Sequence, residues 1–133
     1  MRFVTGGCDN NVKVWTNQSN TDDITKITFT QELLEGHTDW VRDVAWLNYV
    51  GYAYDLIASC SEDEFVYLWT KRDDIWVKSL LKKFNAPIWR VSWSHCGSYL
   101  AVSSGDNSVY LFKVIFKITE RKILTENGKL CQD

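Results

Sequence analysis

The sequence predicts an all-β protein that is built from repeated sheets of four short strands. Three stretches of the 133-residue chain align: TGGCDNNVKVW from residue 5, SCSEDEFVYLW from residue 59 and VSSGDNSVYLF from residue 102. Each has an aspartate four residues after its first position and an aromatic residue six positions later. Apolar residues alternate before that aromatic residue, as in a half-buried strand. Four strands in every ~40 to 45 residues are typical of the blades of a β-propeller.

The first predicted element is an incomplete blade over residues 1–30. Thr5, Asp9 and Trp15 occupy its aligned positions. The Asp-Asn pair in the middle of the stretch marks a tight turn between two strands, because short polar side chains stabilise turns. The polar residues 17–23 then form a loop. The chain therefore enters the repeat inside the second strand of a blade.

The second predicted element is a complete blade over residues 31–83. Its four strands are expected at residues 40–46, 55–61, 65–70 and 76–84. The stretch LNYVGYAYD between the first two strands is a loop insertion. The leucine-rich end of the fourth strand could also form a helical turn, but its place in the repeat favours a strand.

The third predicted element is a degenerate last blade over residues 84–127, followed by a tail at 128–133. IWRVSW at 88–93 repeats the first strand of the preceding blade. Charged and apolar residues alternate over 113–122, which indicates a strand with one face in water. We expect the segment that follows to supply a last outer strand and then to fray.

Composition excludes several classes of function. The net charge of −2 gives no basic surface for nucleic acid. No segment approaches the roughly 18 consecutive apolar residues of a membrane span, so we expect no direct membrane insertion. None of the four cysteines forms a CxxC pair, which favours reduced thiols in the cytoplasm or nucleus. Cys8 and Cys60 fall within expected strands, where a free cysteine behaves as a small apolar residue.

Four residues of the second blade stand at positions that resemble the signature of the WD-repeat family. His37 follows a glycine, and Ser59, Asp63 and Trp69 stand at the matching positions, with Thr after the tryptophan instead of the usual Asp. The resemblance implies a buried hydrogen-bonded network from indole to hydroxyl to imidazole to carboxylate. Trp and His side chains can donate hydrogen bonds, a hydroxyl can donate and accept them, and a carboxylate accepts them. The histidine is therefore expected to be structural.

The other blades keep only parts of this signature. Thr5, Asp9 and Trp15 match in the first blade, without a histidine. In the last blade, Val102 and Phe112 replace the hydroxyl and the indole. We expect that blade to depend on apolar packing.

We expect no catalytic residue, no metal and no cofactor. No nucleophile or carboxylate pair has a recognisable motif. His95 and Cys96 are adjacent, so on a strand they would point to opposite faces and could not share a metal ion.

An enzyme built on the propeller would need a polar cluster at the channel mouth. The candidates are Asp39, Arg42, Asp43 and Arg90, and salt bridges between inner strands explain them better. A second alternative is a regulatory adaptor that presents protein substrates to another enzyme, with Trp40, Arg42 and Trp89 on its rim.

The order of the motifs narrows the resemblance further. It is carried by the stretches GGCDNNVKVW, HTDWVRDVAW, IASCSEDEFVYLW, KKFNAPIWRVSW and LAVSSGDNSVYLF. Together, over residues 3–112, they resemble the small WD-repeat subunit of the outer COPII vesicle coat, the Sec-thirteen family. Members are open six-bladed propellers. The chain would supply about two and three-quarter blades from their C-terminal half, with Met1 as a truncation point or a mis-called start codon.

The resemblance implies a scaffold that binds a larger partner. The partner is the long COPII coat subunit, or a related subunit of the nuclear-pore outer ring, which contributes a blade in trans. The chain would then be cytoplasmic and peripheral at endoplasmic reticulum exit sites and COPII vesicles, or at the nuclear pore. The partner is expected beside the last blade, at Val102, Val109, Leu111 and Phe112. The alternative explanation is that the core residues of a terminal blade drifted in sequence without any role in binding.

Overall fold

The computed structural model describes residues 1–20, 23–48, 54–117 and 122–130, and from residue 116 onward it describes the backbone alone. Eleven strands lie in these residues and form three antiparallel sheets. The predicted all-β fold of propeller blades is confirmed. One sheet of three strands and two of four agree with about two and three-quarter blades.

The first sheet contains β1 (Arg2–Gly6), β2 (Val12–Asn17) and β3 (Phe29–Leu34), in that order. Asn10 has a φ of 66° in the β1–β2 turn, a left-handed conformation that Asn tolerates well. A 3₁₀ turn, η1 (Ile24–Lys26), precedes β3. Because β3 pairs with β2 along its whole length, the sheet ends at Leu34, so the expected boundary at residue 30 was too early.

The second sheet contains β4 (Val41–Trp46), β5 (Leu56–Ser61), β6 (Phe65–Arg72) and β7 (Ile75–Lys83), in that order. The leucine-rich segment is a strand, as its place in the repeat predicted. Asp73 and Asp74 join β6 to β7 with φ of 47° and 62°. Two consecutive positive φ angles make the type of turn whose twist matches that of a hairpin.

The third sheet contains β8 (Ile88–Trp93), β9 (Tyr99–Ser104), β10 (Val109–Lys117) and β11 (Lys122–Leu130), in the order β11-β10-β9-β8. The last outer strand is present, as expected. It pairs with β10 up to Leu130, so the strand extends into the range that the sequence assigned to a tail.

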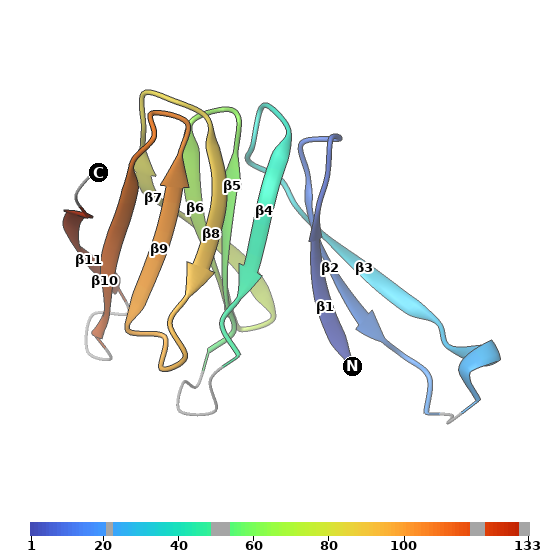
Figure 1. The fold of residues 1–133 in the computed structure, drawn as a ribbon. Coiled ribbons are helices and arrows are strands. Elements are labelled where there is room, and N and C mark those ends of the chain that lie inside the picture. Colours follow the sequence, from blue (N-terminus) through green and yellow to red (C-terminus); the bar gives the residue numbers. More distant parts are fainter. Residues whose placement is uncertain (21–22, 49–53, 118–121, 131–133) are drawn as a thin grey trace.

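Two apolar cores hold the sheets together, and the second sheet lies between them (Figure 1). All six residues of β5 are buried, because this strand faces a neighbour on both sides. Ile57 belongs to the core shared with the first sheet, whereas Leu56 and Cys60 belong to the core shared with the third. The alternation follows from the two-residue period of a strand. It places Cys60 where the sequence predicted it.

The prediction that Cys8 lies within a strand was wrong. Cys8 lies beyond the end of β1, in a turn, and its side chain is exposed. Strand β1 ends at Gly6, so Cys8 lies in the turn toward β2. None of the helices in the described part of the chain is long and apolar enough to span a membrane.

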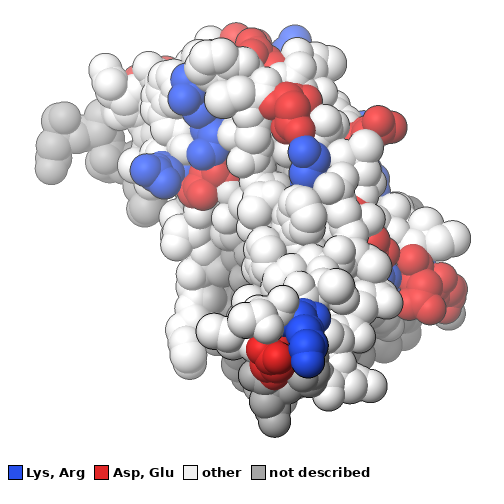
Figure 2. Space-filling model, turned by 90° about the vertical axis from the view of Figure 1, so that its right-hand side faces the viewer, with Lys and Arg blue, Asp and Glu red and all other residues white. Residues whose placement is uncertain are grey.

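The first sheet has one face packed on the second sheet and one face toward solvent. The outward face carries Phe3, which stacks on Trp15 with ring centroids 6.0 Å apart and meets Phe29 edge-on at 5.3 Å. Leu33 is 45% exposed. Figure 2 shows this side of the molecule, with few charged side chains over its middle. The stack of sheets therefore presents an open, largely uncharged face here.

Candidate functional site

The hydrogen-bonded network of the second sheet is assembled from four elements. His37 lies in the connection between β3 and β4, and Ser59 lies in the middle of β5. Asp63 lies in the β5–β6 turn, and Trp69 lies in β6. Ser59 pairs with Tyr67 across the two strands, which puts its hydroxyl near the indole two residues further along β6. The repeat therefore brings together residues that are up to 32 positions apart.

The four side chains are linked in the order Trp69, Ser59, His37 and Asp63. The Trp69 indole N–H donates to Ser59 Oγ at 2.9 Å. Ser59 Oγ and His37 Nε2 are 2.8 Å apart, as are His37 Nδ1 and Asp63 Oδ2. A carboxylate can only accept, so Nδ1 carries the proton of the neutral ring and Nε2 accepts the Ser59 O–H. Every donor of this four-residue network then meets an acceptor.

Burial keeps the imidazole of this network neutral. The side chains of His37 and Asp63 are 0% and 3% exposed. Desolvation lowers the pKa of His37 below its ordinary value of 6.5, and the hydrogen bond and charge of Asp63 oppose this only in part. A group in this state orients and links its neighbours. It does not act as a charged catalytic histidine.

Asp63 also organises the turn that carries it. Its Oδ2 accepts the backbone N–H of Thr38 at 3.0 Å, and its Oδ1 accepts that of Phe65 at 3.0 Å. The carboxylate therefore ties the β3–β4 connection to the β5–β6 turn. Such a fully satisfied polar network specifies one arrangement of the outer and inner parts of a blade.

The first sheet contains the partial network of its three matching residues. The Trp15 indole donates to Thr5 Oγ1 at 3.0 Å. Asp9 accepts the backbone N–H of Asn11 at 3.2 Å and pairs with Lys13. The hydrogen bond from Lys13 lowers the pKa of Asp9. The aspartate thus stabilises its own turn and is not linked to the Thr5–Trp15 pair by a hydrogen bond in the described residues.

The expected partner-binding residues of the third sheet divide between its two faces. Val102 and Phe112 are 0% exposed and belong to the core against the second sheet, so neither side chain can reach a partner of the folded chain. Val109 is 43% exposed, and Leu111 is half-buried. Since β10 alternates with a period of two, both lie on the face opposite to Phe112. Of the four expected partner-binding residues, only Val109 and Leu111 can therefore contact a partner.

Three residues on the rim form a stack of planar groups. The Arg42 guanidinium lies 5.1 Å from the ring centroid of Trp40 and 5.4 Å from that of Trp89. The two indoles are 45% and 41% exposed. Glu62 forms an ion pair with Arg42. The guanidinium is therefore held in place by a carboxylate and two rings, at the N-terminal ends of β4 and β8.

Among the residues that the structure describes, the salt bridges expected between the inner strands do not join Asp39, Arg42, Asp43 and Arg90 to one another. Asp43 Oδ2 instead accepts the backbone N–H of Val91 at 3.1 Å and so joins β4 to β8. Arg42 pairs within its own sheet, because Glu62 follows the neighbouring strand β5. The Trp93 indole N–H also donates to the Ala45 carbonyl at 3.0 Å, so side chains of β4 and β8 join the second and third sheets by hydrogen bonds to backbone.

The remaining candidate groups of the described residues do not form a cluster that could bind a metal ion. Within the described part of the chain, no group of three His, Cys, Asp or Glu side chains could hold a metal ion. His95 and Cys96 lie in the β8–β9 connection. Hydrogen bonding with Ser98 lowers the pKa of the exposed Cys96 thiol to about 7. Burial raises the pKa of Cys60 to about 12.

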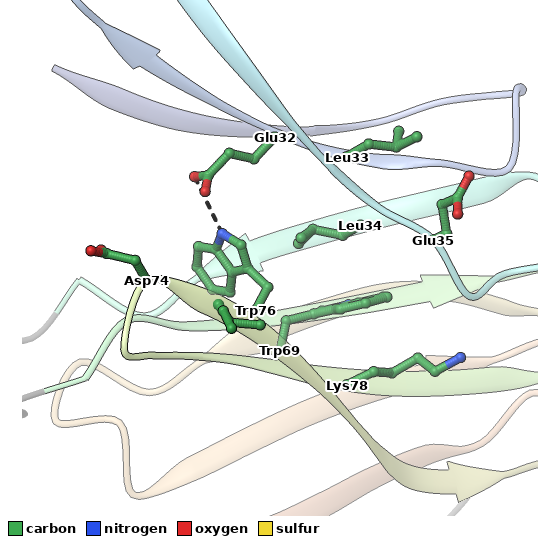
Figure 3. A pocket seen from close by; sticks show the side chains of 9 residues that line it. Glu32, Leu33, Leu34, Glu35, Trp69, Asp74, Trp76 and Lys78 are labelled. Atoms are coloured by element: carbon green, nitrogen blue, oxygen red, sulfur yellow. Dashed lines mark hydrogen bonds between the residues drawn. The ribbon is translucent and has the colours of Figure 1, made fainter.

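A groove between the first and second sheets was not found by reading the sequence. Its volume is about 400 Å³, and β3, β6 and β7 supply its walls. Trp76 lies at its centre and donates from its indole N–H to Glu32 at 3.3 Å, as Figure 3 shows. No sequence motif marks the groove, because its two sides lie about forty residues apart in the chain.

Comparison with known proteins supports the resemblance found in the sequence. The chain is 47% identical over 115 residues to "Protein SEC13 homolog" of Homo sapiens. It is 46% identical over 115 residues to "Protein transport protein sec13" of Schizosaccharomyces pombe, and 48% identical over 116 residues to "Protein transport protein SEC13" of Kluyveromyces lactis. The resemblance to the Sec-thirteen family is confirmed at this level of identity.

Each of these alignments covers 84% of this chain but only 34%, 37% and 37% of the three relatives. The chain therefore spans about a third of the length of the curated relatives it matches. The model of the family "WD domain, G-beta repeat" matches residues 26–70 and 78–113. These two ranges cover more than half of the chain and contain the complete hydrogen-bonded network, so the chain belongs to the WD-repeat family.

Proposed function

We propose that the chain is part of a structural scaffold subunit of the COPII vesicle coat, which acts in protein transport from the endoplasmic reticulum to the Golgi. The observation that carries the proposal is the identity of 46–48% to relatives named SEC13, two of which are named as protein transport proteins. The role is non-catalytic. We place the protein at endoplasmic reticulum exit sites and COPII vesicles, peripheral to the membrane, with the outer ring of the nuclear pore as a second location.

The proposed partner is a larger coat or pore-ring subunit that contributes a blade in trans to an open six-bladed propeller. The outward face of the third sheet supports this proposal. Val109 is 43% exposed there, and Tyr99, which is 41% exposed, lies on the same face because its pairing partner Lys113 is two positions from Leu111. A partner sheet that packs on this face would bury apolar surface, the main favourable contribution to association.

Affinity purification from the source organism tests the role, with the chain extended to its full reading frame and the co-purifying proteins identified by mass spectrometry. We expect a long coat subunit or a pore-ring subunit in near-equal amount. Which of the two is recovered separates the coat from the pore. Recovery of ubiquitin-ligase or kinase components without either subunit would overturn the scaffold role.

The substitution Val109→Glu tests the docking face. We expect it to weaken recovery of the partner at least fivefold, because it places a charge in an apolar contact. Ile24→Glu is the matched control, since Ile24 is 81% exposed and lies in η1, outside this face. Circular dichroism confirms that both variants fold. Undiminished binding by a folded Val109→Glu variant would rule out this face as the docking site.

A regulatory adaptor that presents protein substrates to another enzyme is the second candidate. It is favoured by the exposed Trp40 and Trp89 on either side of Arg42, because Trp and Arg are enriched among residues that dominate protein interfaces. The same purification distinguishes the two roles. Enzyme components that are lost on Trp40→Ala would support the adaptor.

A further inference from the structure

The outer edge of β7 has no partner strand among the described residues. β7 is the last strand in the order β4-β5-β6-β7, and its ladder hydrogen bonds are made with β6. No other backbone hydrogen bond of the described part of the chain reaches it. An unpaired row of N–H and C=O groups is a template for a further strand. The edge is therefore a surface on which an extended segment of another protein can dock.

The alternation of the ladder decides which residues form this edge. Lys71 is paired with Trp76, but its backbone N–H donates to Asp55 at 3.2 Å, away from β7. This pair is therefore one of the non-hydrogen-bonded pairs, which alternate with hydrogen-bonded pairs along an antiparallel ladder. The backbone groups of every second residue of β7 from this pair onward point to the outer edge, namely those of Trp76, Lys78 and Leu80.

Two lysines of β7 carry charges that the chain does not neutralise. The Lys78 ammonium lies 4.9 Å from the ring centroid of Tyr67. The Lys83 ammonium lies 5.7 Å from the ring centroid of Phe65. These cation–π contacts orient the two groups, but neither forms an ion pair with a carboxylate of the described residues. Glu35 lines the same groove as Lys78 and is not paired with it.

The two lysines and Leu80 lie on one face of β7. They are paired with every second residue of β6 from Phe65 to Trp69, and directly paired residues share a face of the sheet. Leu80 lies between Lys78 and Lys83 and is 55% exposed. Along this face, the edge therefore presents a cation, an apolar side chain and a second cation.

The opposite face of the same edge is apolar. Ile75 and Val77 alternate with the residues of the lysine-bearing face and are 67% and 42% exposed. A further strand on β7 would cover both side chains. A second copy of β7 is disfavoured as that strand, because it would gather the lysines of both copies in one ladder, and like charges across strands are destabilising. Lysines on an edge strand thus exclude strands of the same charge and favour an acidic one.

We propose that β7 accepts an extended acidic segment of a partner protein as an added antiparallel strand. Side chains two positions apart on a strand project from one face, so an acidic, an apolar and a second acidic residue at every second position match this edge. The two acids meet Lys83 and Lys78, and the apolar residue packs on Leu80. Residues at the intervening positions cover Val77 and Ile75. The inference goes beyond the proposed function, because the docking face proposed above belongs to the third sheet and β7 belongs to the second.

Fluorescence anisotropy of labelled peptides tests the proposal on the 133-residue chain. The probe is Glu-Thr-Leu-Thr-Glu-Val-Thr-Val with tetramethylrhodamine at its N-terminus. Its counterpart carries the same label and has lysine in place of both glutamates. We expect the glutamate peptide to bind at low ionic strength and to be weakened by salt, and the lysine peptide not to bind.

Backbone methylation tests whether the peptide adds as a strand. The second glutamate of the probe lies opposite Lys78, so its N–H points at β7, and N-methylation there should weaken binding by about tenfold. The valine that follows it is the matched position. Its N–H points away from β7, so we expect N-methylation of this valine to change binding by less than about threefold.

The double variant Lys78→Gln/Lys83→Gln tests the charges. It should weaken binding about fivefold, the effect of losing two solvent-exposed ion pairs. Lys26→Gln/Lys113→Gln is the matched control, because it removes the same charge from two exposed lysines in η1 and β10, outside the second sheet. We expect the control to change binding by less than about twofold. Circular dichroism confirms that both double variants fold.

Amide hydrogen exchange locates the bound peptide on the chain. The amides of Lys78 and Leu80 point to the open edge, so we expect them to exchange more slowly in the complex. The amides of Val77 and Ser79 already bond to β6 and should change little. Equal binding of the two peptides or an equal effect of the two methyl groups would overturn the proposal. So would unchanged binding in the Lys78→Gln/Lys83→Gln variant, no binding at millimolar peptide, or unaltered exchange at Lys78 and Leu80.

Discussion

A single buried imidazole determines how the second sheet holds its outer and inner parts together. His37 receives a hydrogen bond from the Ser59 hydroxyl and donates one to Asp63, and both contacts are 2.8 Å long. The same position in an enzyme would need access to a reacting group, whereas the side chain of His37 is 0% exposed. At the scale of the residue, the function of this histidine is therefore structural.

The hydroxyl of Ser59 is the central link, because it both donates to His37 and accepts from Trp69. We expect Ser59→Ala to lower the free energy of unfolding by about 2 kcal/mol or more, since two buried polar groups lose their partner. Thr5→Ala removes the equivalent hydroxyl of the exposed first-sheet pair and should cost less than about 1 kcal/mol. Urea denaturation followed by tryptophan fluorescence measures both. Equal losses would contradict the difference in burial.

The lowered pKa of His37 predicts how stability depends on pH. The unfolded chain binds this proton near pH 6.5, and the folded chain binds it only at lower pH. The unfolded state is therefore favoured as pH falls below about 6.5, and the contribution of His37 to stability is fully present above that value. Urea midpoints between pH 5.5 and 7.5 should decrease toward acid in the native chain. The decrease should be smaller in His37→Gln, and an equal slope would refute the assignment.

At the scale of the elements, the joint between the first and second sheets depends on one glycine. A Cβ atom at Gly6 would lie 2.5 Å from Cγ1 of Val41, closer than real carbon contacts, and 3.1 Å from Cγ1 of Val44. Both valines are β-branched and stiff, so they cannot turn aside. The end of β1 can thus approach β4 only without a side chain.

We expect Gly6→Ala to destabilise the chain by about 1 to 3 kcal/mol through overpacking. Gly7→Ala is the control. The closest atom to a Cβ there would be Asp9 Oδ1, at 3.0 Å, at the end of a side chain that can move, and the nearest backbone atom lies at 3.9 Å. Thermal unfolding by circular dichroism compares the two variants. A larger effect at Gly7 would show that the β1–β4 contact is not the limiting one.

At the scale of the whole molecule, the stack of three sheets has two outer faces that no other sheet of the described residues covers. The face of the first sheet carries Phe3, Phe29 and Leu33, which are 36%, 37% and 45% exposed. Figure 2 shows few charges over the middle of this side. Exposed apolar surface of this kind favours association with another sheet.

We expect the 133-residue chain to associate in a concentration-dependent manner through this face. Phe29→Thr/Leu33→Thr should reduce the association, because threonine keeps the strand propensity of β3 but removes apolar area. Sedimentation velocity measures the weight-average mass over a range of concentrations. Ile24→Thr, outside the sheet, serves as the control. Association that the double substitution leaves unchanged would place the contact elsewhere.

Much of this architecture could be predicted from the sequence, because its repeat is local. The spacing from Ser59 to Asp63 to Trp69 predicts two strands and the turn between them, and the resemblance to the WD-repeat family implies the hydrogen-bonded network. The alternation of apolar residues in β6 identifies Val66 and Leu68 as core residues, whereas in β10 the matching Val109 and Leu111 lie on the outward face. Such features depend on the two-residue period of a strand and on turn chemistry, which a sequence records directly.

Only the tertiary structure decided which neighbours those elements meet. It placed Val102 and Phe112 inside the core, assigned Asp43 to the backbone of Val91, and formed the groove between β3 and β7. These outcomes depend on how one sheet packs against the next. The residues concerned are about forty to fifty positions apart and share no motif. The sequence by itself therefore determined the blades and their internal network, and the packing of the sheets determined which of their faces remain open to a partner.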